Sequence, residues 1–141
     1  MAAPTKGKSA KSTKSTKGTK KAKKTVTNGR VYIQSTYNNT IVTITDLKGN
    51  AVTWSSAGNV GFKGSRKNTP YAAQQAAYRA IDRAVGEFGM QTVDVYFRGP
   101  GAGKDAAVRA ISNSHKIKVG IVKDITAAPH NGCRPTKRRR M

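Results

Sequence analysis

The sequence predicts one α/β domain built on a mixed five-stranded sheet. Three β-rich segments come first along the chain, and two helix–strand units follow them. This order of elements, β-β-β-α-β-α-β, indicates an antiparallel meander that continues into right-handed parallel crossovers. The chain has 141 residues. It therefore has room for a domain of roughly 100 residues beside terminal segments of a different composition.

The first half of the domain is predicted to hold three strands. Their segments are rich in β-branched residues and alternate apolar with polar positions, as Val31 and Ile33 do on either side of Tyr32. The strands are expected over residues 30–36, 40–46 and 51–55. Turn-forming residues separate them, at Asn38–Asn39 and at Lys48–Gly49–Asn50.

A glycine-rich loop over residues 57–68 leads into the first helix-strand unit. Thr69 is placed to cap the helix, Pro70 to occupy its first position and Gly89 to end it. Spacings of three and four predict one core-facing stripe, made by Ala73, Ala77, Ile81, Val85 and Phe88. The alanines that flank this stripe allow a close approach to a sheet.

The second helix–strand unit follows a strand with strict alternation. The remaining elements are expected as a strand over 92–98, a Gly-Pro-Gly-Ala-Gly turn over 99–103, a helix over about 104–113 and a strand over 118–124. Val108 and Ile111 are expected to face inward from the helix.

Charge is concentrated at the two ends of the chain. Lys and Arg number 27 against 6 Asp and Glu, a net charge of +21. Residues 1–25 hold nine lysines and no acid, and are expected to form a disordered arm. Residues 129–141 are expected to form an extended basic tail, which leaves 26–128 for the globular body. Two cationic ends indicate a polyanionic partner, most commonly a nucleic acid.

The loop Gly61–Lys67 is the first candidate for RNA contact. It places Phe62 among Lys63, Arg66 and Lys67, with glycines that let a backbone approach closely. The bases can pair with phosphates while an exposed Phe62 stacks on a splayed base. In the alternative interpretation, Phe62 packs back onto the body and the charges are solvated.

Residues 99–105 resemble a nucleotide-binding loop only in part. Arg98 stands where that motif requires its first glycine, and Asp105 stands where it requires Ser or Thr. NTP hydrolysis is therefore not expected. Free N–H groups of this turn, beside Arg98 and Lys104, are a candidate phosphate site. A turn that merely reverses the chain is the alternative.

Several other functions are excluded by composition. Two histidines and the single Cys133 cannot supply the four ligands of a structural zinc site, and no metal, cofactor or catalytic group is expected. One cysteine allows no intrachain disulfide and fits a reducing compartment, where we expect Cys133 to be buried. No apolar run reaches the about 18–20 residues of a membrane span. We expect a cytoplasmic protein without a small-molecule substrate. Asn131, followed by Gly132, is a candidate for isoaspartate formation.

The chain resembles the bacterial small-subunit ribosomal protein eleven family over roughly residues 31–140. The strings that carry the resemblance are residues 38–46 (NNTIVTITD), 56–58 (SAG), 61–67 (GFKGSRK), 69–74 (TPYAAQ) and 129–135 (PHNGCRP). The resemblance implies a three-layer, ribonuclease-H-like α/β domain without ribonuclease activity. The lysine-rich residues 1–25 look longer than is usual for that family.

The resemblance also implies partners and contact residues. The family lies on the platform of the small subunit, bridges helices of the central domain of its rRNA, and lines the cleft for the Shine–Dalgarno duplex of mRNA. Its neighbours are the seventh and eighteenth small-subunit proteins, with initiation factor three nearby. The implied RNA contacts are Asn38, Asn39, Lys63, Arg66, Lys67, Arg134, Lys137, Arg138, Arg139 and Arg140.

Two other classes of function stay open on residues alone. A histone-like condensing protein would suit the lysine-rich arm, but it has no use for the structured segments Gly61–Lys67 and Asn131–Pro135. An NTP-using enzyme is weakened by the two motif failures, and an RNA-modifying factor is a minor alternative.

Overall fold

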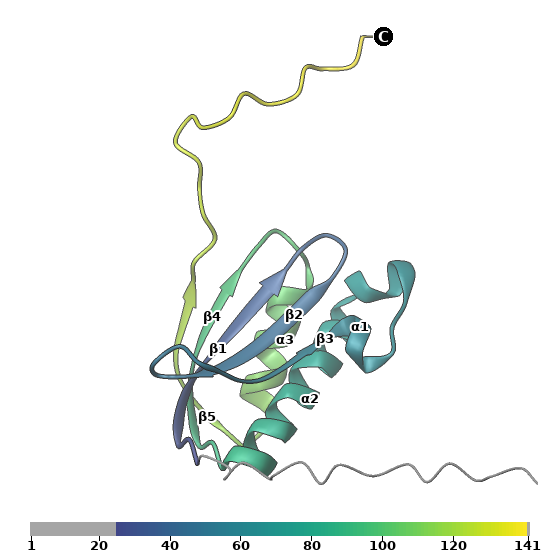
Figure 1. Cartoon of the computed structure of the whole chain (residues 1–141). Coiled ribbons are helices and arrows are strands. Elements are labelled where there is room, and N and C mark those ends of the chain that lie inside the picture. The colour runs from purple at the N-terminus through teal and green to yellow at the C-terminus, as the bar shows by residue number, and fades with distance from the viewer. Residues whose placement is uncertain (1–24, 141) are drawn as a thin grey trace, which may run out of the picture.

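Five strands form one mixed sheet in the order β3-β2-β1-β4-β5 (Figure 1). The computed structural model describes residues 25–140. The elements are β1 (Asn28–Ser35), β2 (Thr40–Asp46), β3 (Ala51–Ser56), α1 (Ala57–Val60), the 3-10 helix η1 (Gly64–Asn68), α2 (Pro70–Phe88), β4 (Thr92–Arg98), α3 (Gly103–Asn113) and β5 (Lys118–Asp124). The class, the mixed sheet and the order of the main elements are as the sequence predicted.

The central strand is β1, which joins the antiparallel and parallel halves of the sheet. It pairs antiparallel with β2 and parallel with β4, so that Val31 lies between Ile44 and Val95. On the outer sides β3 pairs antiparallel with β2, and β5 pairs parallel with β4. The predicted meander followed by two parallel crossovers is therefore confirmed.

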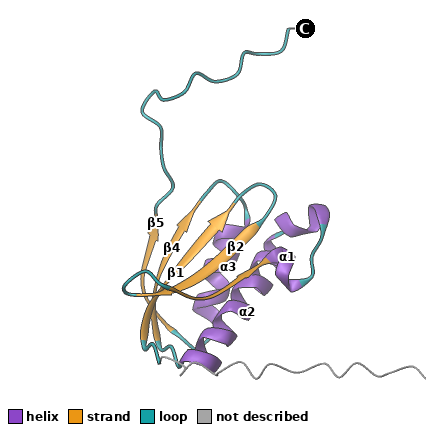
Figure 2. Cartoon of the chain, viewed as in Figure 1, coloured by secondary structure: helices purple, strands orange, loops and turns teal. Residues whose placement is uncertain are grey.

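Both long helices lie on the same face of the sheet (Figure 2). The helix α2 packs over β2 and β3, α3 packs over β1, β4 and β5, and the two helices contact each other. The reason is that both crossovers, from β3 to β4 and from β4 to β5, step across the sheet in one direction. Right-handed connections that step in one direction place their helices on one face.

The layer count differs from the three layers that the resemblance implied. In the part of the chain that the structure describes, one layer of helices covers one face of the sheet. The opposite face carries Tyr32 and Tyr96, whose rings stack with centroids 5.4 Å apart. Trp54 is exposed on the same face. Residues 126–140 form no helix that could cover this second face.

The core lies between the sheet and the two helices α2 and α3. Alternate residues of β1 and β2 are buried there, and so is the alanine-rich side of α2. The main buried side chains are Val31, Ile33, Val42, Ile44, Ala73, Ala76, Ala77, Ala80, Ile81, Ala84, Val95 and Ile111. Short alanine side chains let the helix axis approach the sheet closely. The predicted core-facing stripe is therefore confirmed from Ala73 to Ile81, where its residues are buried. Val85, Phe88 and Val108 are only partly buried.

Local signals explain where α2 begins and ends. The side chain of Thr69 accepts a hydrogen bond from the N–H of Ala72 at 3.3 Å, and Pro70 occupies the first position. Gly89 ends the helix with a positive φ of 67°. The segment 57–68, predicted as a loop, instead folds into α1 and η1. Ser56 caps α1 by accepting from the N–H of Asn59 at 3.2 Å.

The two terminal segments differ in what can be described. The predicted arm, residues 1–25, lies outside the described residues except for Thr25. Next to it, the N–H of Val26 donates to the Phe88 carbonyl at 3.0 Å. Residues 126–140 extend away from the domain without helix or strand, and all are exposed (Figure 1). The prediction that Cys133 is buried is therefore wrong, because Cys133 lies on this extended segment.

Among residues 25–140 no helix is both long and apolar enough to span a membrane.

Candidate nucleic-acid interface

One end of the sheet gathers most of the sequence-predicted contact residues. The strands β1, β3, β4 and β5 all run toward this end, and β2 starts from it (Figure 1). The turn 36–39, the segment 57–68 and the turn 98–104 therefore meet there. We call these three segments together the strand-end surface. The C-terminal segment leaves the domain from the same end, after β5 (Figure 1).

The strand-end surface is cationic. It contains seven of the predicted contact residues, namely Asn38, Asn39, Lys63, Arg66, Lys67, Arg98 and Lys104. Two described carboxylates lie beside it, Asp105 at the start of α3 and Asp124 at the end of β5. The other four acidic residues of the chain lie on other parts of the fold. Cations thus outnumber carboxylates here even before the tail is counted.

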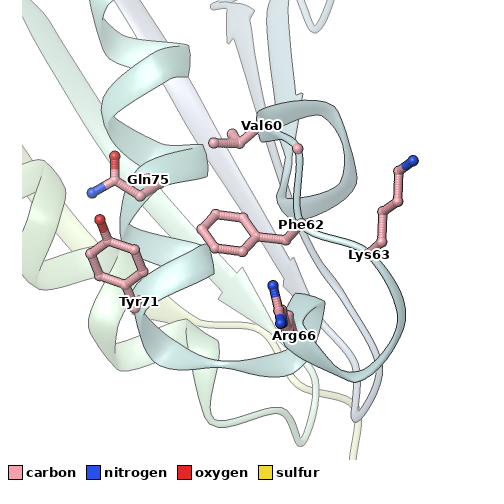
Figure 3. A pocket seen from close by; sticks show the side chains of 7 residues that line it. Val60, Phe62, Lys63, Arg66, Tyr71 and Gln75 are labelled. Carbon is pink, nitrogen blue, oxygen red and sulfur yellow. The ribbon is translucent and has the colours of Figure 1, made fainter.

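A hollow of about 530 Å³ opens between the segment 60–66 and α2 (Figure 3). Its lining residues are Val60, Gly61, Phe62, Lys63, Arg66, Tyr71 and Gln75. The Phe62 ring points from the segment toward α2, and it makes a T-shaped contact with Tyr71, with the centroids 5.9 Å apart and the planes at 88°. Phe62 is half-buried, whereas Tyr71 remains 59% exposed.

This arrangement favours the interpretation in which Phe62 packs back onto the body. The aromatic ring offered to a ligand is chiefly that of Tyr71, which the sequence analysis missed. A signal was present, because Tyr71 follows the basic loop and lies outside the buried alanine stripe of α2. Its pairing with Phe62, nine positions earlier, depends on how the segment folds back onto the helix.

Hydrogen bonds fix the segment that carries these residues. Arg79 on α2 donates to the carbonyl of Asn59 at 2.8 Å, and the N–H of Phe62 donates to the carbonyl of Ala57 at 3.2 Å. At the other end, the hydroxyl of Thr69 donates to the carbonyl of Arg66 at 2.8 Å. Gly61 has a φ of 116°, which a side chain would strain. The basic loop is therefore held in one shape before any ligand binds.

The turn between β1 and β2 is organised by Thr36. Its hydroxyl oxygen accepts from the N–H groups of Asn38 at 3.4 Å and of Asn39 at 3.1 Å. Asn38 is exposed, while the side-chain oxygen of Asn39 is buried and has no hydrogen-bond partner among the described residues. Of the two predicted contact residues, Asn38 is the more accessible to a ligand.

In the glycine turn after β4, two N–H groups are already used by hydrogen bonds within the fold. The N–H of Gly99 donates to the hydroxyl of Thr126 at 3.2 Å, and the N–H of Gly101 donates to the carbonyl of Ser35 at 3.2 Å. A side chain on either glycine would overlap Ser35, and one on Gly103 would overlap Thr40. The glycines are thus required for close packing against β1 and β2. The candidate phosphate site, beside Arg98 and at the start of α3, stays a prediction.

The two cations beside this turn have different surroundings. Arg98 is exposed and donates to the side-chain carbonyl of Gln34 at 2.9 Å, which leaves further guanidinium N–H groups for a ligand. Lys104 is half-buried, with its ammonium 3.6 Å from Asp124 and 5.6 Å from the centre of the Phe97 ring. Arg98 is therefore the more available of the two.

The base of the tail is tied to the domain. The N–H of Ile125 donates to the Phe97 carbonyl at 2.9 Å, and the N–H of Thr126 donates to Asp124 at 2.8 Å. The hydrogen bond from the Thr126 hydroxyl, then that from its N–H, and the nearby Lys104 hold the pKa of Asp124 below its ordinary value. Beyond this anchor the predicted contacts Arg134, Lys137, Arg138, Arg139 and Arg140 are all exposed.

Within residues 25–140, no group of three or more His, Cys, Asp and Glu side chains could hold a metal ion.

Comparison with known proteins identifies the family. The model of the family described as ribosomal protein S11 matches residues 29–140. The small ribosomal subunit protein uS11 of Nitratidesulfovibrio vulgaris is 58% identical over 118 residues, which is 84% of this chain and 90% of that protein. A match of this extent confirms the resemblance read from the sequence strings. The chain therefore belongs to the ribosomal protein S11 family.

Proposed function

We propose that this protein is a structural, non-catalytic constituent of the small ribosomal subunit that binds rRNA through the strand-end surface and the tail. The observation that carries the proposal is the gathering of Lys63, Arg66 and Arg98 at the end of the sheet from which the tail departs. Family membership supports the ribosomal role. The bacterial ribosome is a cytoplasmic particle, which agrees with the cytoplasmic location expected from the sequence.

The mechanism that we propose is architectural. The fixed segment 57–68 and the turn 36–39 recognise the shape of folded RNA, because their backbones are already held by internal hydrogen bonds. The tail has no such internal restraint in the described residues, and its five cations can follow phosphates between RNA helices. A rigid body and an adaptable tail together would join separate rRNA elements.

The finer placement that we propose follows the family resemblance. The protein would lie on the platform, bridge helices of the rRNA central domain, and line the cleft that receives the Shine–Dalgarno duplex of mRNA. Its neighbours there would be the seventh and eighteenth small-subunit proteins, with initiation factor three nearby. The cationic strand-end surface supports an RNA-facing orientation for that end of the domain.

Sedimentation and RNA recovery test the ribosomal role. Tagged protein from a cell lysate is expected to migrate stoichiometrically with small subunits on a sucrose gradient, and sequencing of its bound RNA is expected to recover small-subunit rRNA. Recovery with the nucleoid, or of DNA and RNA without preference, would instead support the condensing class and contradict the proposal.

Salt dependence tests the mechanism. If about eight to ten phosphates are neutralised, log affinity for rRNA should fall with log salt at a slope of roughly −6 to −9. A variant with all five tail cations, Arg134, Lys137, Arg138, Arg139 and Arg140, changed to serine should have a slope shallower by roughly 4. A slope near −2 for the unaltered protein would overturn the electrostatic part of the proposal.

A further inference from the structure

We infer that the hollow between Phe62 and Tyr71 holds one unpaired nucleobase of the bound RNA. The inference rests on the proposed function, and it names the part of the RNA that this site takes. It goes beyond phosphate contact, because a base recognised in a pocket requires an RNA loop, bulge or strand end.

The shape of the hollow suits a planar group. Its volume of about 530 Å³ lies within the roughly 300–1,000 Å³ of small-molecule sites. One wall is formed by Phe62 and Val60 on the segment, and the other by Tyr71 and Gln75 on α2 (Figure 3). Hydrogen bonds already hold the segment on the helix, so the site exists before RNA binds.

The aromatic geometry leaves a surface for stacking. Because Phe62 meets Tyr71 at 88°, the two rings do not stack on each other. Tyr71 keeps 59% of its surface exposed, although the next two residues of the helix, Ala72 and Ala73, are fully buried. An exposed ring beside cations is the arrangement by which proteins stack unpaired bases.

Polar groups around the hollow match the rest of a nucleotide. The side-chain amide of Gln75 carries both a donor and an acceptor, as the edge of any base requires. The guanidinium of Arg66 lies beside Phe62, while the side chain of Lys63 extends away from the Phe62 ring (Figure 3). Arg66 can therefore contact the phosphate of the bound nucleotide, and Lys63 a phosphate further along the strand.

Charge favours an anionic occupant such as RNA over a basic or apolar peptide. None of the seven residues that line the hollow is acidic, whereas the neighbouring hollow along α2 is lined by Asp82 and Glu87 as well as Arg79 and Arg83. Phosphates would be repelled by the carboxylates of the second hollow. The inference therefore concerns only the hollow between Phe62 and Tyr71, where a base can bind beside a phosphate that contacts a cationic side chain.

A duplex cannot deliver a base to this site, because its bases are stacked within the helix and paired with each other. The occupant is accordingly an unpaired nucleotide. The site itself does not select one kind of base, because stacking on Tyr71 accepts any base and the amide of Gln75 can rotate to offer its donor or its acceptor. The RNA therefore determines which base is bound.

The test compares matched tyrosine variants on small-subunit rRNA. Tyr71→Ala is expected to weaken binding about 5- to 150-fold without changing the salt slope, because stacking is lost and charge is not. Tyr71→Phe should retain most of the affinity. Trp54→Ala removes an aromatic side chain that is 54% exposed but lies on β3, outside both the hollow and the strand-end surface, and its effect should be at least several-fold smaller.

Ultraviolet crosslinking locates the base. In the unaltered protein, crosslinks from Tyr71 or Phe62 are expected to map to one unpaired rRNA nucleotide. Crosslinks to paired nucleotides alone, or equal losses for Tyr71→Ala and Trp54→Ala, would overturn the inference. Failure of the unaltered protein to bind rRNA would instead contradict the proposed function, so the two failures are distinguishable.

Discussion

The ammonium of Lys104 lies 3.6 Å from the carboxylate of Asp124, which joins the first turn of α3 to the last residue of β5. Lys104 also lies over the ring of Phe97. The pair is partly exposed, so it contributes little to folding stability, as is usual for surface ion pairs. The pair matters instead for RNA binding. Because Lys104 faces a carboxylate of its own chain, its charge is already partly neutralised before it meets an RNA phosphate.

Replacing Lys104 should therefore affect RNA binding less than replacing Arg66. Arg66→Ala is expected to make the salt slope for rRNA shallower by about 1, and Lys104→Ala by less, with no effect of added ATP on either variant. Lys48→Ala, in the exposed turn at the opposite end of the sheet, serves as the charge-matched control. Filter binding across a salt series measures all three. A larger effect for Lys104 than for Arg66 would show that its ion pair opens on binding.

Acid should weaken the anchor at the base of the tail. The pKa of Asp124 is lowered in the folded protein, first by the Thr126 hydroxyl, then by the Thr126 N–H and the charge of Lys104. A carboxyl with a lowered folded pKa stabilises the fold at neutral pH, and that contribution is lost as the pH falls through the folded value. The loss is thus expected mainly below about pH 4, where an ordinary aspartate is already about half protonated.

Asp124→Asn removes that titration and provides the comparison. Urea midpoints measured from pH 7 to below pH 3 should decline less steeply for Asp124→Asn than for the unaltered protein. Asp46, whose pKa is also lowered, chiefly by the side-chain amide of Asn50, lies at the opposite end of the sheet and contributes a second acid-sensitive step. Identical pH profiles for the two proteins would show that Asp124 makes no measurable contribution.

Two glycine-to-alanine changes should have opposite effects on stability. Gly99 has a φ of 107°, and an added Cβ would overlap the Ser35 carbonyl, so Gly99→Ala should destabilise the fold by about 2 kcal/mol or more. Gly86 lies inside α2 with nothing within 4 Å of an added Cβ. Gly86→Ala should stabilise it by about 0.5–1 kcal/mol. Urea unfolding measures both, and a neutral Gly99→Ala would contradict the close-packing argument.

The alanine side of α2 should resist larger residues. Ala80 is fully buried between the helix and the sheet, in line with Ala73, Ala76 and Ala77. Ala80→Leu adds three carbon atoms to a close-packed contact and should cost about 1–3 kcal/mol or more. Thermal unfolding followed by circular dichroism provides the measurement. As a control, Arg83→Leu places the same leucine side chain one turn later at a partly exposed position and should cost far less.

The sequence predicted those features that depend on local signals. The bounds of α2 follow from Thr69, Pro70 and Gly89, each of which acts within one helical turn. The strands followed from alternation, because burial of one face imposes a period of two. Both helices lie on one face because the crossovers step in one direction, which is a property of strand order that no single segment contains.

Features that depend on distant residues were missed. Gln34 and Arg98 are hydrogen-bonded although they lie 64 positions apart. The packing of the glycine turn on Ser35 was not predicted, because Ser35 belongs to another strand. Tyr71 emerged as the exposed aromatic residue only once Phe62 was seen to fold back onto α2. Residues that share a surface through topology alone give no local signal of it.

Asn131 is expected to form isoaspartate. It is exposed, has a positive φ of 54°, and is followed by Gly132, which has no side chain to hinder attack. The backbone nitrogen of Gly132 would attack the side-chain carbon of Asn131 and release ammonia, and water would then open the succinimide. Aged protein should therefore lose the Asn131 amide, as measured by peptide mass, and become a substrate in an isoaspartyl methylation assay.

A matched variant separates this chemistry from general ageing of the chain. An added Cβ on Gly132 would meet only the Cβ of Pro129, at 3.9 Å, so Gly132→Ala should leave the local fold unchanged. It should nevertheless slow conversion strongly, because the methyl group hinders approach of the backbone nitrogen to the amide carbon. If the unaltered protein shows no conversion, or if Gly132→Ala converts equally fast, succinimide chemistry at Asn131 is excluded. If the tail is bound to rRNA as proposed, assembled protein should convert more slowly than free protein. RNA contact would restrict the backbone rotation that brings the Gly132 nitrogen to the Asn131 side chain.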